Sequence, residues 1–135
     1  MNSIPYIAEQ FTALLDRDVD LADTDWAYNL EYVFGLNEFS TDVVCSIAPD
    51  DVAEVTHAWA RQGDYAELNL AALMRLTDGS WAAVAAWCDT SGWDCQSGVD
   101  WAVGTREHVI SQGLDLESRR HLGLTLPGES AAVPN

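Results

Sequence analysis

The chain has 135 residues, 48% of them apolar, and carries 22 acidic residues against 6 basic ones, all arginine, for a formal net charge of −16. This length and composition predict one domain with a hydrophobic core and exclude a disordered chain or two separate domains. The charge argues against direct binding to nucleic acid or to an anionic membrane, and it favours basic protein surfaces as partners. Acidity that merely keeps a tryptophan-rich protein in solution is the alternative interpretation.

No apolar run is long enough to cross a bilayer, and the N-terminal residues MNSIPYIAEQ have neither the basic region nor the cleavage site of a signal peptide. We therefore expect the protein in the cytoplasm of a cell or of a virus-infected cell. Three cysteines, an odd number, do not suggest a disulfide scaffold, and thiols are the expectation in a reducing cytosol.

The N-terminal half predicts two helices. Apolar residues recur at helical spacing over residues 4–16, where Ser3 can act as the N-cap and Pro5 lies in the first turn. A second helix is expected over residues 25–34, and Gly35 is placed to end it.

Between these helices lies an acidic segment that merits a test as a calcium loop. Asp16, Asp18 and Asp20 match the first three ligand positions of an EF-hand. Leu21 stands where the loop needs glycine, and Ala27 where it needs a bidentate glutamate. The pattern fails at both points, so we expect an acidic connection between helices and no metal site.

Residues 43–47 are rich in β-formers and suit either a strand or an extended connector. The following residues fit a helix beginning at Pro49 or a strand over residues 52–60 that joins the sheet described next, and we favour the strand.

The Asp78-Gly79 pair between apolar runs is a strong hairpin signal. With these two residues as the loop, Leu76 should face Trp81. That register predicts a core face, on which the helices pack, formed by Leu70, Ala72, Met74, Leu76, Trp81, Ala83, Ala85 and Trp87. The other face is small and mixed, and it is either solvated or meets a flat partner.

After a loop at residues 89–94, a third strand is expected over residues 95–104. Thr105 can cap a short helix that Gly113 ends, and Asp115 can cap another over residues 116–122 that Gly123 ends. The basic cluster at residues 119–121 suits the C-terminal end of that helix and could dock on the acidic front. Residues 125–135 have no periodicity and are expected to be a loose tail.

Cys88 and Cys95 bracket the loop and could lie opposite each other. A small disulfide, a metal site and a pair of small buried side chains are the three interpretations. No matching second Cys or His pair follows, which argues against a metal.

Trp93 in the same loop is either an exposed binding anchor or folds back onto the sheet. The three histidines, His57, His108 and His121, are scattered along the chain, and no hydrolase, metalloprotease or nucleotide-binding motif occurs. We therefore expect no catalytic residues and no cofactor.

The run LMRLTDGSWAAVAAWCDTSGWDCQ, with the later GLDLESRRHLGL, resembles a group of small uncharacterised proteins of actinobacteria and their phages. The resemblance covers about residues 52–124, with Gly92 to Gln96 as its most specific part. It implies an extended segment before the hairpin and carries no activity. The first fifty residues depart from the group and are where a particular partner would bind.

These observations predict an α+β domain over residues 1–124, with an acidic helical part at 1–48 and a hairpin part at 49–124. The fold is a three- or four-stranded antiparallel meander with its N-terminal and short C-terminal helices packed on one face.

The favoured function is a small, acidic, non-enzymatic protein-interaction module of phage or mobile-element type that engages a basic surface and could mimic the charge of DNA or inhibit its partner. The expected contacts are Asp16, Asp18, Asp20, Asp23, Asp25 and Trp93. A virion or assembly component is one alternative, and an enzyme built on Cys88, Cys95 and a histidine is another.

Overall fold

The computed structural model describes residues 4–15, 26–36, 43–62, 68–89 and 96–129. Four strands form one antiparallel sheet in the order β1-β2-β3-β4, which confirms an α+β fold with a meander and a strand at residues 52–60. The elements are α1 (Ile4–Leu14), α3 (Trp26–Val33), the 3₁₀ turn η1 (Pro49–Asp51), β1 (Val52–Gln62), β2 (Leu68–Leu76), β3 (Trp81–Asp89), β4 (Gln96–Gly104), α4 (Arg106–Gly113) and α5 (Leu116–Leu122).

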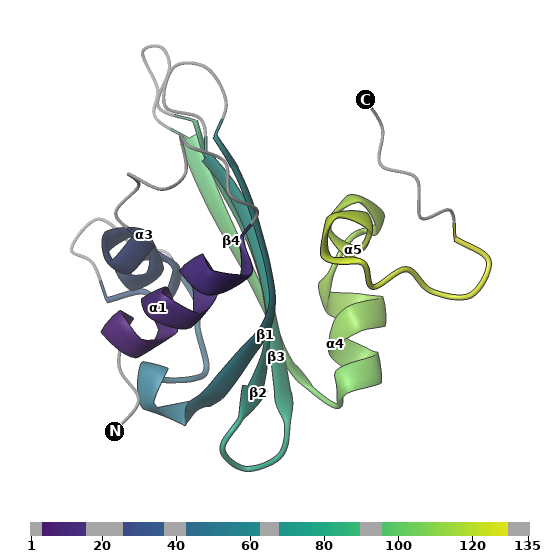
Figure 1. Cartoon of the computed structure of the whole chain (residues 1–135), viewed down its shortest axis with the longest axis horizontal. Coiled ribbons are helices and arrows are strands. Elements are labelled where there is room, and N and C mark those ends of the chain that lie inside the picture. Colours follow the sequence, from purple (N-terminus) through teal and green to yellow (C-terminus); the bar gives the residue numbers. More distant parts are fainter. Residues whose placement is uncertain (1–3, 16–25, 37–42, 63–67, 90–95, 130–135) are drawn as a thin grey trace.

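The helices cover both faces of the sheet. Figure 1 shows α1 and α3 against one face, here called the N-helix face, and α4 and α5 against the other, the C-helix face. The prediction that all helices pack on one face is therefore wrong. In the central strand β2, every residue from Leu70 to Met74 is buried, so successive side chains on both faces need cover.

The β2–β3 hairpin has a three-residue loop. The Leu76 N–H donates to the Ser80 carbonyl (2.8 Å), and the Gly79 N–H donates to the Leu76 carbonyl (3.0 Å). Gly79 adopts a φ of +89°, a conformation that glycine tolerates at the end of such a loop. Arg75, and not Leu76, is therefore the partner of Trp81, so the predicted register is wrong by one residue.

A shift of one residue exchanges the faces of one whole strand relative to the other. On the N-helix face, Leu70, Ala72 and Met74 pair with Ala86, Val84 and Ala82. Trp81, Ala83, Ala85 and Trp87 instead share the C-helix face with Asn69, Ala71, Leu73 and Arg75. The face that we expected to be either solvated or in contact with a flat partner is in part a second core. Its buried members are Ala71, Leu73, Ala83, Val109, Ile110, Leu114 and Leu122.

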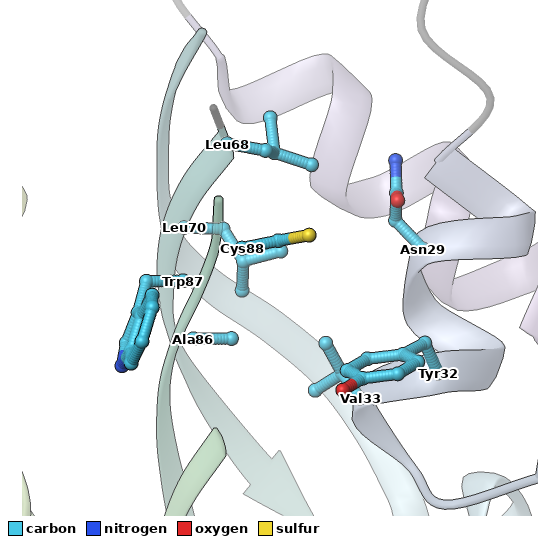
Figure 2. A pocket seen from close by; sticks show the side chains of 8 residues that line it. All are labelled: Asn29, Tyr32, Val33, Leu68, Leu70, Ala86, Trp87 and Cys88. Carbon is cyan, nitrogen blue, oxygen red and sulfur yellow. The ribbon is translucent and has the colours of Figure 1, made fainter. Parts of the chain in front are cut away.

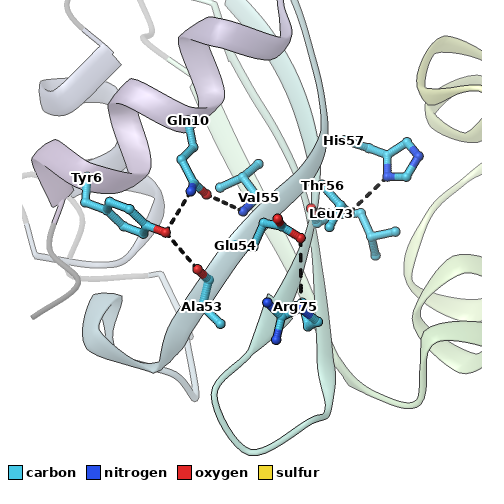
Figure 3. Close-up of polar contacts among 9 residues, drawn as sticks. All are labelled: Tyr6, Gln10, Ala53, Glu54, Val55, Thr56, His57, Leu73 and Arg75. Carbon is cyan, nitrogen blue, oxygen red and sulfur yellow. Dashed lines mark hydrogen bonds and ion pairs between the residues drawn. The ribbon is translucent and has the colours of Figure 1, made fainter.

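Side chains of α1 satisfy backbone groups of the edge strand β1, as Figure 3 shows. The Tyr6 hydroxyl donates to the Ala53 carbonyl (2.9 Å), and the Val55 N–H donates to Gln10 Oε1 (2.7 Å). Gln10 Nε2 in turn donates to the Tyr6 hydroxyl (2.7 Å). The register of β1 against β2 is irregular at both places, so these backbone groups depend on α1.

The predicted caps of the C-terminal helices are present. The His108 N–H donates to Thr105 Oγ1 (3.1 Å), and the Ser118 N–H donates to Asp115 Oδ1 (2.7 Å). Gly123 ends α5 in the left-handed conformation, with φ of +72°. Such signals are local, which is why the sequence predicts them well.

Residues 125–129, which we expected to be loose, are tied to α5. Arg119 is buried and forms a two-pronged ion pair with Glu129, and it also donates to the Leu114 carbonyl. The Leu126 N–H donates to the same Glu129 carboxylate (2.7 Å). The hydrogen bonds from Arg119 and Leu126 lower the pKa of Glu129. None of the described helices is both long and apolar enough to cross a membrane.

Candidate functional site

A groove of about 290 Å³ lies on the C-helix face between the sheet and α5. All four strands, the cap of α5 and α5 itself contribute polar and aromatic side chains to it. The main lining residues are Trp59, Arg61, Asn69, Trp87 and Asp100 from the sheet, and Asp115, Glu117, Ser118 and His121 from α5 and its cap.

Trp87 is held against the sheet by a glycine on the neighbouring strand. Gly98 is its cross-strand partner, and a Cβ atom built on Gly98 would lie 2.5 Å from Trp87 Nε1. The indole therefore covers the glycine, an arrangement that only glycine permits here. Figure 2 shows that Trp87 points away from α3, whereas Cys88 and Leu70 point towards it. Trp87 remains 43% exposed, so part of its ring is open to the groove.

Trp59 and His121 form a stacked pair in the same groove. Their ring centroids are 3.9 Å apart and the rings are inclined by 10°. The guanidinium carbon of Arg61 lies 5.9 Å from the centre of the Trp59 ring, a cation–π distance. His121 Nε2 lies 3.5 Å from Glu117 Oε1, yet it is buried and has no hydrogen-bond partner among the described residues. This nitrogen is an unsatisfied polar atom in the groove wall.

The groove carries a net negative charge. Asp100, Asp115 and Glu117 contribute three carboxylates, and Arg61 contributes one positive charge. The Asp115 carboxylate caps α5, and Glu117 lies beside His121. Asp100 is exposed, and no hydrogen bond or ion pair with another described residue engages its carboxylate. A cation entering the groove would find this carboxylate uncommitted.

The acidic residues predicted to bind a partner, and the loop tryptophan, fall outside the described residues, so these contacts stay predictions. They are Asp16, Asp18, Asp20, Asp23, Asp25 and Trp93.

The pairing of Cys88 with Cys95 also stays a prediction, because Cys95 lies outside the described residues. The β3–β4 register places Ser97 opposite Cys88. Cys88 lines a small pocket with Asn29 and Tyr32 of α3 (Figure 2), whose volume of about 30 Å³ has room for about one water molecule. This pocket is too small to hold an organic ligand.

The histidines do not assemble a metal site within the described part of the chain. No group of three or more His, Cys, Asp or Glu side chains with suitable geometry occurs there. His57 on β1 has a lowered pKa, chiefly because burial disfavours its charged form and also because Arg106 is near. Burial raises the pKa of the Cys45 thiol, which donates to the Ile47 carbonyl at 3.3 Å. A raised pKa makes Cys45 a poor nucleophile at neutral pH.

Searches against protein-family models, curated proteins and solved structures find no match to this chain. The resemblance to small actinobacterial and phage proteins therefore stays a prediction from residues 52–124. The groove could not be found from the sequence, because the predicted hairpin register, which is wrong by one residue, places Trp87 on the same face as Met74. The sequence signal that was overlooked is the glycine at position 98, which stands opposite a tryptophan.

Proposed function

We propose that this protein is a small, acidic, non-enzymatic interaction module that binds a basic surface of a partner protein. The observation that carries the proposal is the charge, 22 acidic residues against 6 basic ones. A field of this sign attracts basic surfaces over distances of about 10 Å at 0.1 M ionic strength and repels nucleic acid. The carboxylates of the groove add a local negative site to this general field.

The acidic segment between the first two helices is the proposed primary contact, with Trp93 as an additional anchor. Its closely spaced aspartates resemble a row of phosphates in charge, so mimicry of DNA or inhibition of a nucleic-acid-binding partner follows from the proposal. The resemblance to actinobacterial and phage proteins supports a phage or mobile-element origin and action in the bacterial cytoplasm.

Fluorescence anisotropy with a labelled arginine-rich peptide, measured over a range of NaCl concentrations, tests the proposal. Binding should weaken steeply as salt rises, because exposed charges are screened. A glutamate-rich peptide of the same length should not bind. Equal affinity for the arginine-rich peptide at low and high salt would overturn the electrostatic basis of the function.

Removing four charges from the acidic segment should abolish this binding. The combined variant is Asp16→Asn, Asp18→Asn, Asp20→Asn and Asp23→Asn. The matched control removes four charges from exposed positions elsewhere, through Glu9→Gln, Glu31→Gln, Asp50→Asn and Glu107→Gln. If both variants weaken binding equally, the net charge acts as a whole and the acidic segment is not the contact.

A further inference from the structure

We infer that the groove on the C-helix face is a binding subsite for the guanidinium group of an arginine side chain on the partner protein. The inference rests on the proposed function in one respect, since it requires a basic partner. It differs from that function in its location, because the groove and the acidic segment between α1 and α3 consist of different residues.

The aromatic side chains of this face already bind arginines of the chain itself. Arg61 lies over Trp59 at 5.9 Å, and Arg106 lies over Trp81 at 5.5 Å from the ring centre. Trp87 lies on the same face, and no arginine of the described residues lies over it. Trp87 as a residue is 43% exposed, so its indole is open to a cation, and tryptophan is the side chain that forms the strongest cation–π contacts.

A carboxylate stands close to this open ring. Asp100 lies two residues beyond Gly98 on β4, and Gly98 is the cross-strand partner of Trp87. Side chains in this diagonal relation on one sheet face are about 7 Å apart. A guanidinium stacked on Trp87 can therefore reach the uncommitted Asp100 carboxylate with its N–H groups.

The wall of the groove supplies a second reason for a donor-rich ligand. Besides Asp100, the exposed carboxylates of Asp115 and Glu117 line the groove. A guanidinium carries five N–H donors, so it can pair with more than one of the carboxylates that line the groove. An anion would instead meet Asp100, Asp115 and Glu117, and its entry would be opposed.

Arginine is favoured over lysine by the shape of the site. The Trp87 indole covers Gly98 and is partly exposed, and a planar guanidinium can stack on an exposed indole face while its N–H groups point outwards in its own plane. A lysine ammonium is a compact point charge that cannot do both. The subsite should therefore distinguish two peptides of equal charge.

Three labelled peptides test this inference by fluorescence anisotropy: an arginine-rich peptide, the same peptide with every arginine replaced by lysine, and the same peptide with one arginine replaced by citrulline. Citrulline keeps the shape of arginine and removes its charge. The arginine peptide should bind best. Trp87→Leu should weaken its binding about tenfold, the upper range for loss of a cation–π contact at a partly exposed site. Trp87→Phe, which keeps an aromatic face, should weaken it less.

Two further variants separate the groove from the general charge. Asp100→Asn should weaken binding up to about fivefold, the effect of one exposed ion pair, whereas Glu31→Gln on α3, which loses the same charge elsewhere, should have a smaller effect. Gly98→Ala changes no charge, but its methyl group would meet the Trp87 ring and must displace it. It should therefore weaken binding as Trp87→Leu does. Circular dichroism and thermal melting identify any variant that fails to fold.

The outcomes separate the inference from the proposed function. If wild type binds the arginine peptide and neither Trp87→Leu nor Asp100→Asn alters the affinity, the groove is not the subsite, although the proposed function stands. Equal affinity for the arginine and lysine peptides, unaffected by these variants, likewise overturns the subsite alone. If wild type binds no basic peptide even at low salt, the proposed function fails and the inference falls with it.

Discussion

Replacing Gln10 with alanine should show how strongly α1 holds the edge strand β1. The Gln10 side chain accepts a hydrogen bond from the Val55 N–H at 2.7 Å, at a place where the pairing of β1 with β2 is irregular. Val55 is only 4% exposed, so its N–H has little access to water once the Gln10 acceptor is removed. The substitution therefore leaves a buried N–H without a partner (Figure 3).

The expected cost follows from two opposing effects. An unsatisfied buried N–H costs about 1–3 kcal/mol. Alanine improves the helix propensity of position 10 by only a few tenths of a kcal/mol over glutamine. The net loss should be about 2 kcal/mol, which for a domain of this length lowers the melting temperature by about 7 °C.

Thermal and urea unfolding, followed by circular dichroism, measure this change. Glu9→Ala is the matched control, because Glu9 is exposed on the same helix and has nearly the same helix propensity as glutamine. It should change stability by less than about 0.5 kcal/mol. Equal effects of the two substitutions would refute the role of Gln10 as the acceptor for Val55.

Tyr6 gives a further check, since it joins Gln10 to the Ala53 carbonyl. Tyr6→Phe should cost about 1 kcal/mol, because Ala53 is half-buried and water can reach part of its carbonyl. The double variant should cost less than the sum of the two single ones, because the bond between Gln10 Nε2 and the Tyr6 hydroxyl is lost in either single variant.

Two other predictions concern the C-terminal helices. Gly113→Ala should lower the melting temperature despite a helix-propensity gain of up to about 1 kcal/mol, because its methyl group would collide with that of Ala102; Ala102→Gly should relieve the loss in the double variant. Glu129→Gln should destabilise the fold at pH 7 by leaving the buried Arg119 without its carboxylate. Since the Arg119 contact lowers the folded-state pKa of Glu129, its contribution is present above the ordinary glutamate pKa of about 4.3 and is lost as the pH falls through the lowered value. The melting-temperature difference between wild type and Glu129→Gln should therefore shrink at low pH, and a constant difference would contradict this linkage.

Local signals explain why the sequence predicts most of the elements. Thr105, Asp115 and Gly123 act within one or two turns of chain, and each occupies the cap position expected of it. The strand predicted over residues 52–60 is also confirmed. The alternative, a helix beginning at Pro49, is present only as the 3₁₀ turn Pro49–Asp51. The packing of these elements depends on long-range contacts that no local pattern contains.

The hairpin register illustrates this limit. A two-residue loop and a three-residue loop both place Asp78 and Gly79 at its tip, and the Asp78 carboxylate stabilises the observed loop by accepting from the Ser80 N–H at 2.9 Å. Alternation of apolar residues normally decides between registers. Here β2 and β3 are apolar on both faces, as the adjacent buried pairs Ala71–Ala72 and Ala82–Ala83 show, so alternation gives no decision.

That single residue of register is what creates the candidate site. In the predicted pairing, Trp87 would lie with Met74 in the core beneath the helices. In the observed pairing it lies opposite Asn69 on one side and Gly98 on the other, on the C-helix face and beside Asp100. A large aromatic ring at the partly uncovered end of a sheet loses the burial that a core position would give it. Its position is explained by contact with the glycine and by the groove, and substitution of Trp87 should therefore affect binding more than folding.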